Sequence, residues 1–342
     1  MTSDDTSPRD PRHFPEPEDL AIPAASFSPD ADAERTPKLA SAMREHFRLQ
    51  LLGALRHAGD ALGGLRRLQE RWADLDANLA FGPAVFAAYG TLMDAMRRGS
   101  PEAVVDACQG LWTLGDDAIH DARFRAGSIL EEPWEAPIVH LMRREPREDG
   151  APGPVAVQPL LDRDLSALGT AFQRARALIA AADPDLDVEI ETHVTRLKWF
   201  AGHGIDGAAS PRGFGVVFLR IPLKEEPVGF ILARYVREAT AFFLQTLRAH
   251  DPLLVNAAES AGTVPAGPLA SVLNAAVGDY RAGRVLDHAA RFHPGIDLGN
   301  ARERVAASLE RALGVLRAQA VFTPAGARLA AGLGIDARRQ KS

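Results

Sequence analysis

Apolar side chains recur at three- and four-residue steps through most of this chain, and that spacing limits its fold more than any other feature. Leu39, Met43 and Phe47 begin one such run directly after Thr36-Pro37. Side chains at these steps share one helix face, and proline suits the first helical turn. The spacing predicts helices over residues 37–76 (with a break at Gly53 or Gly63-Gly64), 83–98, 101–123, 160–182, 185–200, 227–249, 268–291 and 299–319.

One segment has the composition of a β-strand. Residues 213–222 are rich in β-branched and aromatic side chains and are bounded by glycine and proline, which is typical of a strand. The preceding residues, 202–207, have the composition of a loop. Alanine, leucine and arginine dominate elsewhere and favour helix. We therefore expect a mainly α fold, with a helical bundle-like core and a minor β element near 214–221 preceding the helix at 227–249.

Proline and glycine divide the chain into parts. Residues 1–36 are rich in Pro, Asp and Ser, so they can bury little apolar surface and are expected to form a flexible arm. Residues 146–158 combine Pro, Gly and charge and are expected to form a linker or loop. These segments predict an N-terminal helical lobe at 37–145 and a helical core at 159–334.

Charge and cysteine content narrow the classes of protein. Lys and Arg number 39 against 45 Asp and Glu, a formal net charge of -6, which argues against nucleic acid or an anionic membrane as a partner. Cys108 is the one cysteine, so no internal disulfide can form, and its helical surroundings predict a buried apolar role. The N-terminus lacks a signal-peptide pattern and no apolar run reaches about 18 residues. We therefore expect a soluble, cytoplasmic protein.

The order of elements in the second half resembles a known family. A strand at 214–219 is followed by a proline-bounded turn, the helix Phe230 to Leu244, and Asp251-Pro252 with the residues up to 256. This order resembles the HExxH-motif peptide-modification proteins found with ribosomally made peptide natural products (RiPPs). The resemblance covers about residues 205–292, and more weakly 322–326. It implies an origin among iron- and 2-oxoglutarate-dependent hydroxylases that act on peptide side chains.

The resemblance also implies a lost metal site. In that family two histidines four residues apart share one helix face and bind a metal, with a third ligand from a later helix. Here the motif reads Arg237-Glu238-Ala239-Thr240-Ala241, and the third position falls at Asn274. Arginine has no free acceptor, alanine has no donor atom, and an asparagine oxygen is a poor ligand for iron or zinc. A degenerate member without a metal or other cofactor is expected, in which Glu238 alone remains.

Three functions are compatible with these residues. The first is a pseudoenzyme of RiPP maturation that binds a precursor peptide, or a peptide-modifying enzyme of the same pathway, through the metal-free former active-site groove. Arg237 would then either fill the vacated site in a salt bridge or bind a carboxylate, for which a guanidinium is suited. The candidate substrate-binding residues are Arg220, Tyr235, Arg237, Tyr280 and Arg281, with Lys224 as a further cation.

The other two functions are catalytic. A metal-free or unconventional peptide-modifying enzyme would use Glu238 as acid or base and Arg237 as an electrostatic clamp. A surviving metal site would instead combine Glu238 and Asn274 with Asp279 or a distant histidine. The sequence leaves open whether the chain is an enzyme, which peptide it binds and whether it forms an oligomer.

Overall fold

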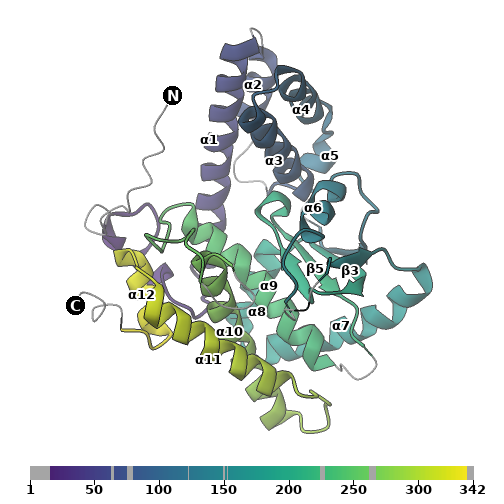
Figure 1. Ribbon diagram of the computed structural model, residues 1–342, viewed down its shortest axis with the longest axis vertical. Coiled ribbons are helices and arrows are strands. Elements are labelled where there is room, and N and C mark those ends of the chain that lie inside the picture. Colours follow the sequence, from purple (N-terminus) through teal and green to yellow (C-terminus); the bar gives the residue numbers. More distant parts are fainter. Residues whose placement is uncertain are drawn as a thin grey trace. The chain divides into compact units, whose positions relative to one another are not determined.

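The computed structural model describes residues 16–62, 65–74, 80–121, 123–148, 151, 153–223, 228–261 and 267–336. It is 62% helical and has a small mixed sheet (Figure 1), so the expected mainly α fold with a minor β element is confirmed. The sheet has five strands, however, whereas the sequence pattern predicts one.

Most predicted helices are present with close bounds. The first predicted helix is divided in two, because α1 continues through Gly53 and ends at Leu62; Gly63 and Gly64 lie outside the described residues. Ser100 and Thr323 begin helices by accepting hydrogen bonds from backbone N–H groups three residues on, as N-capping residues do. The helices are α1 (Thr36–Leu62), α2 (Arg66–Ala73), α3 (Pro83–Arg98), α4 (Pro101–Thr113), α5 (Asp116–Ile119), α6 (Glu135–Met142), α7 (Asp162–Ala182), α8 (Pro184–His193), α9 (Val228–Arg248), α10 (Leu269–Phe292), α11 (Ala301–Gln319) and α12 (Pro324–Gly332).

Three parallel strands form the centre of the sheet. β3 (Arg196–His203) lies between β1 (Arg125–Ser128) and β5 (Val216–Arg220), and both neighbours are parallel to it. β4 (Gly207–Ala209) pairs antiparallel with β5, and β2 (Ala156–Gln158) pairs antiparallel with the end of β3. The predicted strand is β5.

The predicted helix at 185–200 is wrong beyond His193. From Arg196 the chain enters β3, so the predicted loop at 202–207 also contains the end of β3 and the start of β4. The strand contains two charged residues, Arg196 and Lys198, and both side chains are buried in the sheet. Ion pairs with residues more than sixty positions away stabilise these charges. The sequence pattern around the strand does not reveal partners at such a distance.

The described chain falls into two compact units, each assembled from distant segments. The sheet unit comprises residues 40–173 and 190–221, and the C-terminal unit comprises residues up to 39, 174–189 and those from 222 on. The predicted boundaries at 37, 146 and 159 stay a prediction. Within the C-terminal unit, Ile22 and Phe27 are buried, so the described part of the predicted arm contributes apolar side chains to that unit. Residues 1–15 lie outside the described residues.

Each unit has its own apolar packing. In the sheet unit, α1 to α5 share a buried cluster that includes Trp72, Phe86, Cys108 and Leu111, and burial raises the pKa of the Cys108 thiol. The buried role expected for this cysteine is therefore confirmed. In the C-terminal unit, α10 packs against both α9 and α11 (Figure 1).

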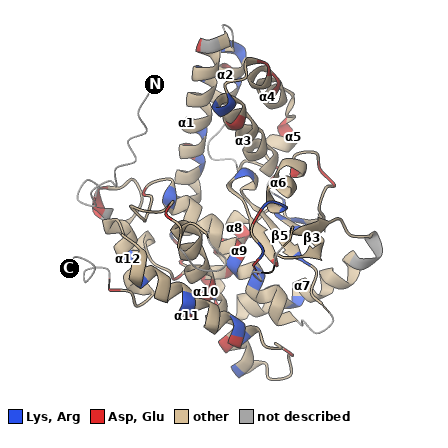
Figure 2. Cartoon of the chain, in the orientation of Figure 1, with Lys and Arg blue, Asp and Glu red and all other residues tan. Residues whose placement is uncertain are grey.

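The charged residues are dispersed through the fold. Figure 2 shows Lys and Arg in blue and Asp and Glu in red, scattered over the elements rather than gathered in one block of either sign. Across the described residues, every helix is too short or too polar to cross a membrane.

The pairing of β2 with β3 depends on a glycine. Gly202 has a φ of 151°, and a Cβ placed there would lie 1.8 Å from the carbonyl oxygen of Ala156. We predict that Gly202→Ala lowers the free energy of unfolding by about 1–3 kcal/mol, because backbone must move to admit the methyl group. Urea unfolding followed by circular dichroism measures this change.

Gly53→Ala is the matched control for that variant. A Cβ at Gly53, inside α1, meets nothing within 4 Å. Alanine should therefore raise the free energy of unfolding by about 0.5–1 kcal/mol, since it costs less backbone entropy than glycine. Equal stability of the two variants would show that Gly202 is not constrained as described.

Candidate functional site

The segment Arg237–Ala241, which is predicted from the sequence to be a degenerate motif, lies where α9 and α10 pack closely in the C-terminal unit. A Cβ added to Gly278 on α10 would lie 3.0 Å from the Cα of Arg237 on α9. Further along α9, the Nη2 of Arg248 donates a hydrogen bond of 3.0 Å to the carbonyl oxygen of Ala270, near the start of α10. These two contacts show that the helices run antiparallel and that Gly278 marks their crossing.

The other two degenerate positions lie one helical turn from this crossing. Ala241 follows Arg237 by four residues, and Asn274 precedes Gly278 by four. Because the helices are antiparallel, both residues lie one turn from the crossing and on the same side of it. Ala241 is buried and Asn274 is half-buried. The structure thus brings Arg237, Ala241 and Asn274 to one part of the helix pair, and their descent from metal ligands stays a prediction.

An ion pair occupies the first of these positions. The Nη1 of Arg237 lies 3.5 Å from the Oδ1 of Asp279, whose side chain is 3% exposed against 26% for the arginine. The Oδ2 of Asp279 and the Oδ1 of Asn274 are buried and have no hydrogen-bond donor among the described residues. Buried acceptors are nearly always satisfied in native proteins. The crossing therefore holds a cation in contact with Asp279, and α10 carries two buried acceptors that require a donor.

Two other predicted binding residues hold the N-terminal segment. Arg281 is buried and grips Glu189 with both Nη atoms, at 2.5 and 3.3 Å, while its Nε donates to the carbonyl oxygen of Pro29. Burial raises the pKa of Glu189 against the opposing effect of Arg281. The hydroxyl of Tyr280 donates to Asp30 at 3.1 Å. The donors of Arg281 are thus used within the unit, and no local pattern in the sequence indicates this role.

The remaining candidates are dispersed. Tyr235 is fully buried in α9, and half-buried Glu238 follows Arg237 on the same helix. Arg220 belongs to β5 in the sheet unit, where its Nε donates to Asp206 at 3.0 Å. Lys224 lies outside the described residues. In the described part of the chain, no three His, Cys, Asp or Glu residues are grouped so that they could hold a metal ion.

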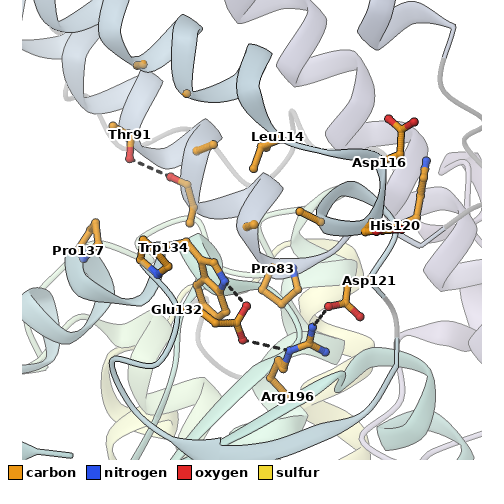
Figure 3. Close-up of a pocket in the computed structure, with 18 of the residues that line it drawn as sticks. Pro83, Thr91, Leu114, Asp116, His120, Asp121, Glu132, Trp134, Pro137 and Arg196 are labelled. Atoms are coloured by element: carbon orange, nitrogen blue, oxygen red, sulfur yellow. Dashed lines mark hydrogen bonds and ion pairs between the residues drawn. The ribbon is translucent and has the colours of Figure 1, made fainter.

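A cavity of about 1240 Å³ lies in the sheet unit, where the sequence predicted no site (Figure 3). Helices α3 and α4 both turn small side chains toward it, at the three- and four-residue steps that define one helix face. The start of α6 contributes Pro133, Trp134 and Pro137. The small residues in the lining are Ala84, Ala87, Ala88, Ala103, Ala107 and Gly110.

A buried arginine on β3 anchors the polar end of the cavity. Arg196 is 1% exposed and forms ion pairs with Asp121 and, from Nε at 3.6 Å, with Glu132. Its Nη1 donates to the carbonyl oxygen of Arg123 at 2.5 Å. Glu132 also accepts a hydrogen bond of 2.8 Å from the indole Nε1 of Trp134 (Figure 3). This chain of contacts fixes the indole at the edge of the cavity.

A second buried cation holds the loop that follows β1. Lys198 lies two residues beyond Arg196 and so on the same face of β3, with its Nζ at 2.9 Å from Glu131 and 2.7 Å from Glu135. Burial raises the pKa of Glu135 although Lys198 opposes it. Burial also tends to lower the pKa of Lys198, but the carboxylates of Glu135 and Glu131 outweigh it and the pKa is raised.

The same loop contains a residue in a left-handed conformation. Leu130 has a φ of 63°, which is uncommon for a residue other than glycine, and its N–H donates to the Glu135 carboxylate. The carboxylates of the loop are therefore held both by Lys198 and by the backbone. This arrangement positions Trp134 beside the cavity.

The comparisons with known proteins leave the family open. No protein-family model matches the chain, and no curated protein matches it. The resemblance to the HExxH family therefore depends on this sequence alone, over about residues 205–292 and more weakly 322–326, and stays a prediction. For the cavity, the recurring small residues of α3 and α4 were the signal present in the sequence, but nothing local shows that those faces line an open space.

The Lys198–Glu135 pair predicts a pH-dependent defect. Lys198→Met leaves the Glu135 carboxylate buried without its cation, and we expect a loss of about 3–5 kcal/mol in the free energy of unfolding at neutral pH. A raised folded-state pKa means that protonation favours the folded state, so the loss should shrink as pH falls toward the ordinary carboxyl range. Urea unfolding of variant and wild type at about pH 5 and pH 8 measures this dependence.

The double variant Lys198→Met with Glu135→Gln is the control. It removes both charges, so it should recover much of the stability and lose the pH dependence. A single variant whose defect is the same at both pH values would contradict the assignment of the charge to Glu135.

Proposed function

We propose that the chain is a pseudoenzyme of peptide natural-product (RiPP) maturation that binds a precursor peptide without modifying it. The binding face is the part of α9 and α10 that carries the degenerate motif. The Arg237–Asp279 ion pair carries this proposal. A permanently protonated guanidinium at a former ligand position repels a metal ion and has no lone pair to offer it.

The unsatisfied acceptors of α10 support a guest with many hydrogen-bond donors. The buried Oδ1 of Asn274 and Oδ2 of Asp279 lack donors among the described residues, and a buried polar atom without a partner is costly. A peptide supplies a backbone N–H at every residue except proline. A precursor peptide, or a segment of a partner enzyme of the same pathway, can therefore satisfy atoms that the chain leaves unpaired.

One observation favours the metal-free enzyme as a second candidate. The side chain of Arg237 is 26% exposed and contacts Asp279 through one nitrogen, while half-buried Glu238 is its neighbour. An accessible guanidinium can stabilise negative charge that develops on a peptide carbonyl. In this candidate Glu238 would transfer the proton.

Removal of one unsatisfied acceptor tests the binding face. We predict that Asn274→Leu weakens binding of a fluorescein-labelled synthetic copy of the precursor peptide encoded beside the gene by about three- to tenfold, because one hydrogen bond is lost. Fluorescence polarisation measures the Kd. Ser271→Leu, at an exposed position one turn earlier on α10, is the control and should bind as the wild type does. If the wild type binds neither this peptide nor the modifying enzyme of the pathway, the proposal is wrong.

Glu238→Gln separates the two candidates. For a pseudoenzyme we predict that the variant binds the peptide with an unchanged Kd and that neither protein alters the mass of the peptide. Mass spectrometry after prolonged incubation measures this. A modification that the wild type makes and the folded variant does not would support the metal-free enzyme instead.

A further inference from the structure

We propose that the cavity in the sheet unit is a docking site for a bulky apolar side chain of a bound peptide. The inference rests on the proposed function only in taking the guest to be a peptide. The cavity shares no residue with the face on α9 and α10, so the two sites can be tested separately.

The size of the cavity and the small side chains of α3 and α4 that line it suit a peptide segment. Its volume of about 1240 Å³ exceeds the roughly 300–1,000 Å³ of ordinary small-molecule pockets. The small side chains of α3 and α4 that line the cavity leave space beside these helices, and a Cβ added at Gly110 would meet nothing within 4 Å. A guest can therefore lie along α3 and α4 and place a large side chain against the alanines.

Trp134 supplies the apolar contact that such a side chain requires. The ring is half-buried, and its Nε1 is held by Glu132, which lies beside the buried Arg196. Because the indole is already fixed, little conformational freedom is lost when a guest packs against it. Aromatic side chains placed in this way provide much of the energy of binding in protein interfaces.

The polar groups around the cavity favour a peptide over a lipid or a singly charged metabolite. Asp117 and Arg123 both line it and are exposed, and neither forms an ion pair among the described residues. The Nδ1 of His120, in the same lining, is buried and has no hydrogen-bond partner there. Charges of both signs beside an unsatisfied ring nitrogen complement a peptide backbone, which offers donors and acceptors together.

The experiment fills the cavity and measures peptide binding by the full chain. A phage-displayed library of random peptides is selected on the wild type, and selected peptides are synthesised with a fluorescent label. We expect them to share a bulky apolar residue whose replacement by alanine weakens binding about tenfold or more. Gly110→Trp should weaken binding of the parent peptides to a similar degree, because the indole occupies the space of the guest.

Gly169→Trp is the matched control. Gly169 also lies inside a helix of the sheet unit, a Cβ there meets nothing within 4 Å, and the residue does not line the cavity. Its peptide affinities should equal those of the wild type. Thermal unfolding of both variants verifies that they fold.

Photocrosslinking from a position in the cavity shows whether the peptide binds there, independently of any indirect effect of Gly110→Trp on the structure. A photoreactive p-benzoylphenylalanine in place of Thr91, which lines the cavity, should crosslink to the labelled peptide, and the same group in place of exposed Val105 should not. Unchanged binding by Gly110→Trp, or no crosslink from position 91, overturns the docking site while leaving the function proposed for α9 and α10 intact. If the wild type selects no peptide at all, the docking site is overturned, whereas the function proposed for α9 and α10 is decided separately by the Kd for the precursor peptide.

Discussion

The missing side chain at Gly278 lets α10 approach α9 until the two backbones nearly touch at Arg237. At that separation the partly exposed side chain of Arg237 contacts the buried carboxylate of Asp279. The other positions of the degenerate motif are carried to the same face by helical geometry. The close crossing thus brings a cation, an alanine and an amide to one part of the helix pair, and none of these is a good ligand for a metal such as iron.

Buried charge organises the sheet unit in a different way. Arg196 and Lys198 are removed from water on one face of β3, and that desolvation is tolerated because carboxylates from the segment 121–135 surround them. The same contacts fix the loop after β1 and the indole of Trp134. The open space beside α3 and α4 therefore has a wall that is held by these ion pairs together with the apolar packing of Trp134 on the cluster that contains Ile129 and Ile138.

Much of the fold could be predicted from the sequence because helices are encoded locally. The apolar steps gave α3 as 83–98, and the β-branched run identified β5. The prediction failed at β3, where the signal depends on partners far along the chain: Asp121 and Glu131 make Arg196 and Lys198 tolerable inside a sheet. The candidate site divides in the same manner. The spacing of Arg237 and Ala241 on one helix is local, whereas the contact with Asp279 and the sequestering of Arg281 by Glu189 require the folded chain.

The function proposed for α9 and α10 requires that this helix pair binds no metal. Elemental analysis of the purified, untagged protein, before and after anaerobic loading with Fe(II), Zn(II) and Mn(II), tests that claim directly. We predict no stoichiometric metal under any of these conditions, since a guanidinium and a methyl group stand at two of the three positions. One equivalent of bound metal that is lost on Glu238→Gln or Asp279→Asn would contradict the account and restore a metal-dependent enzyme at this face.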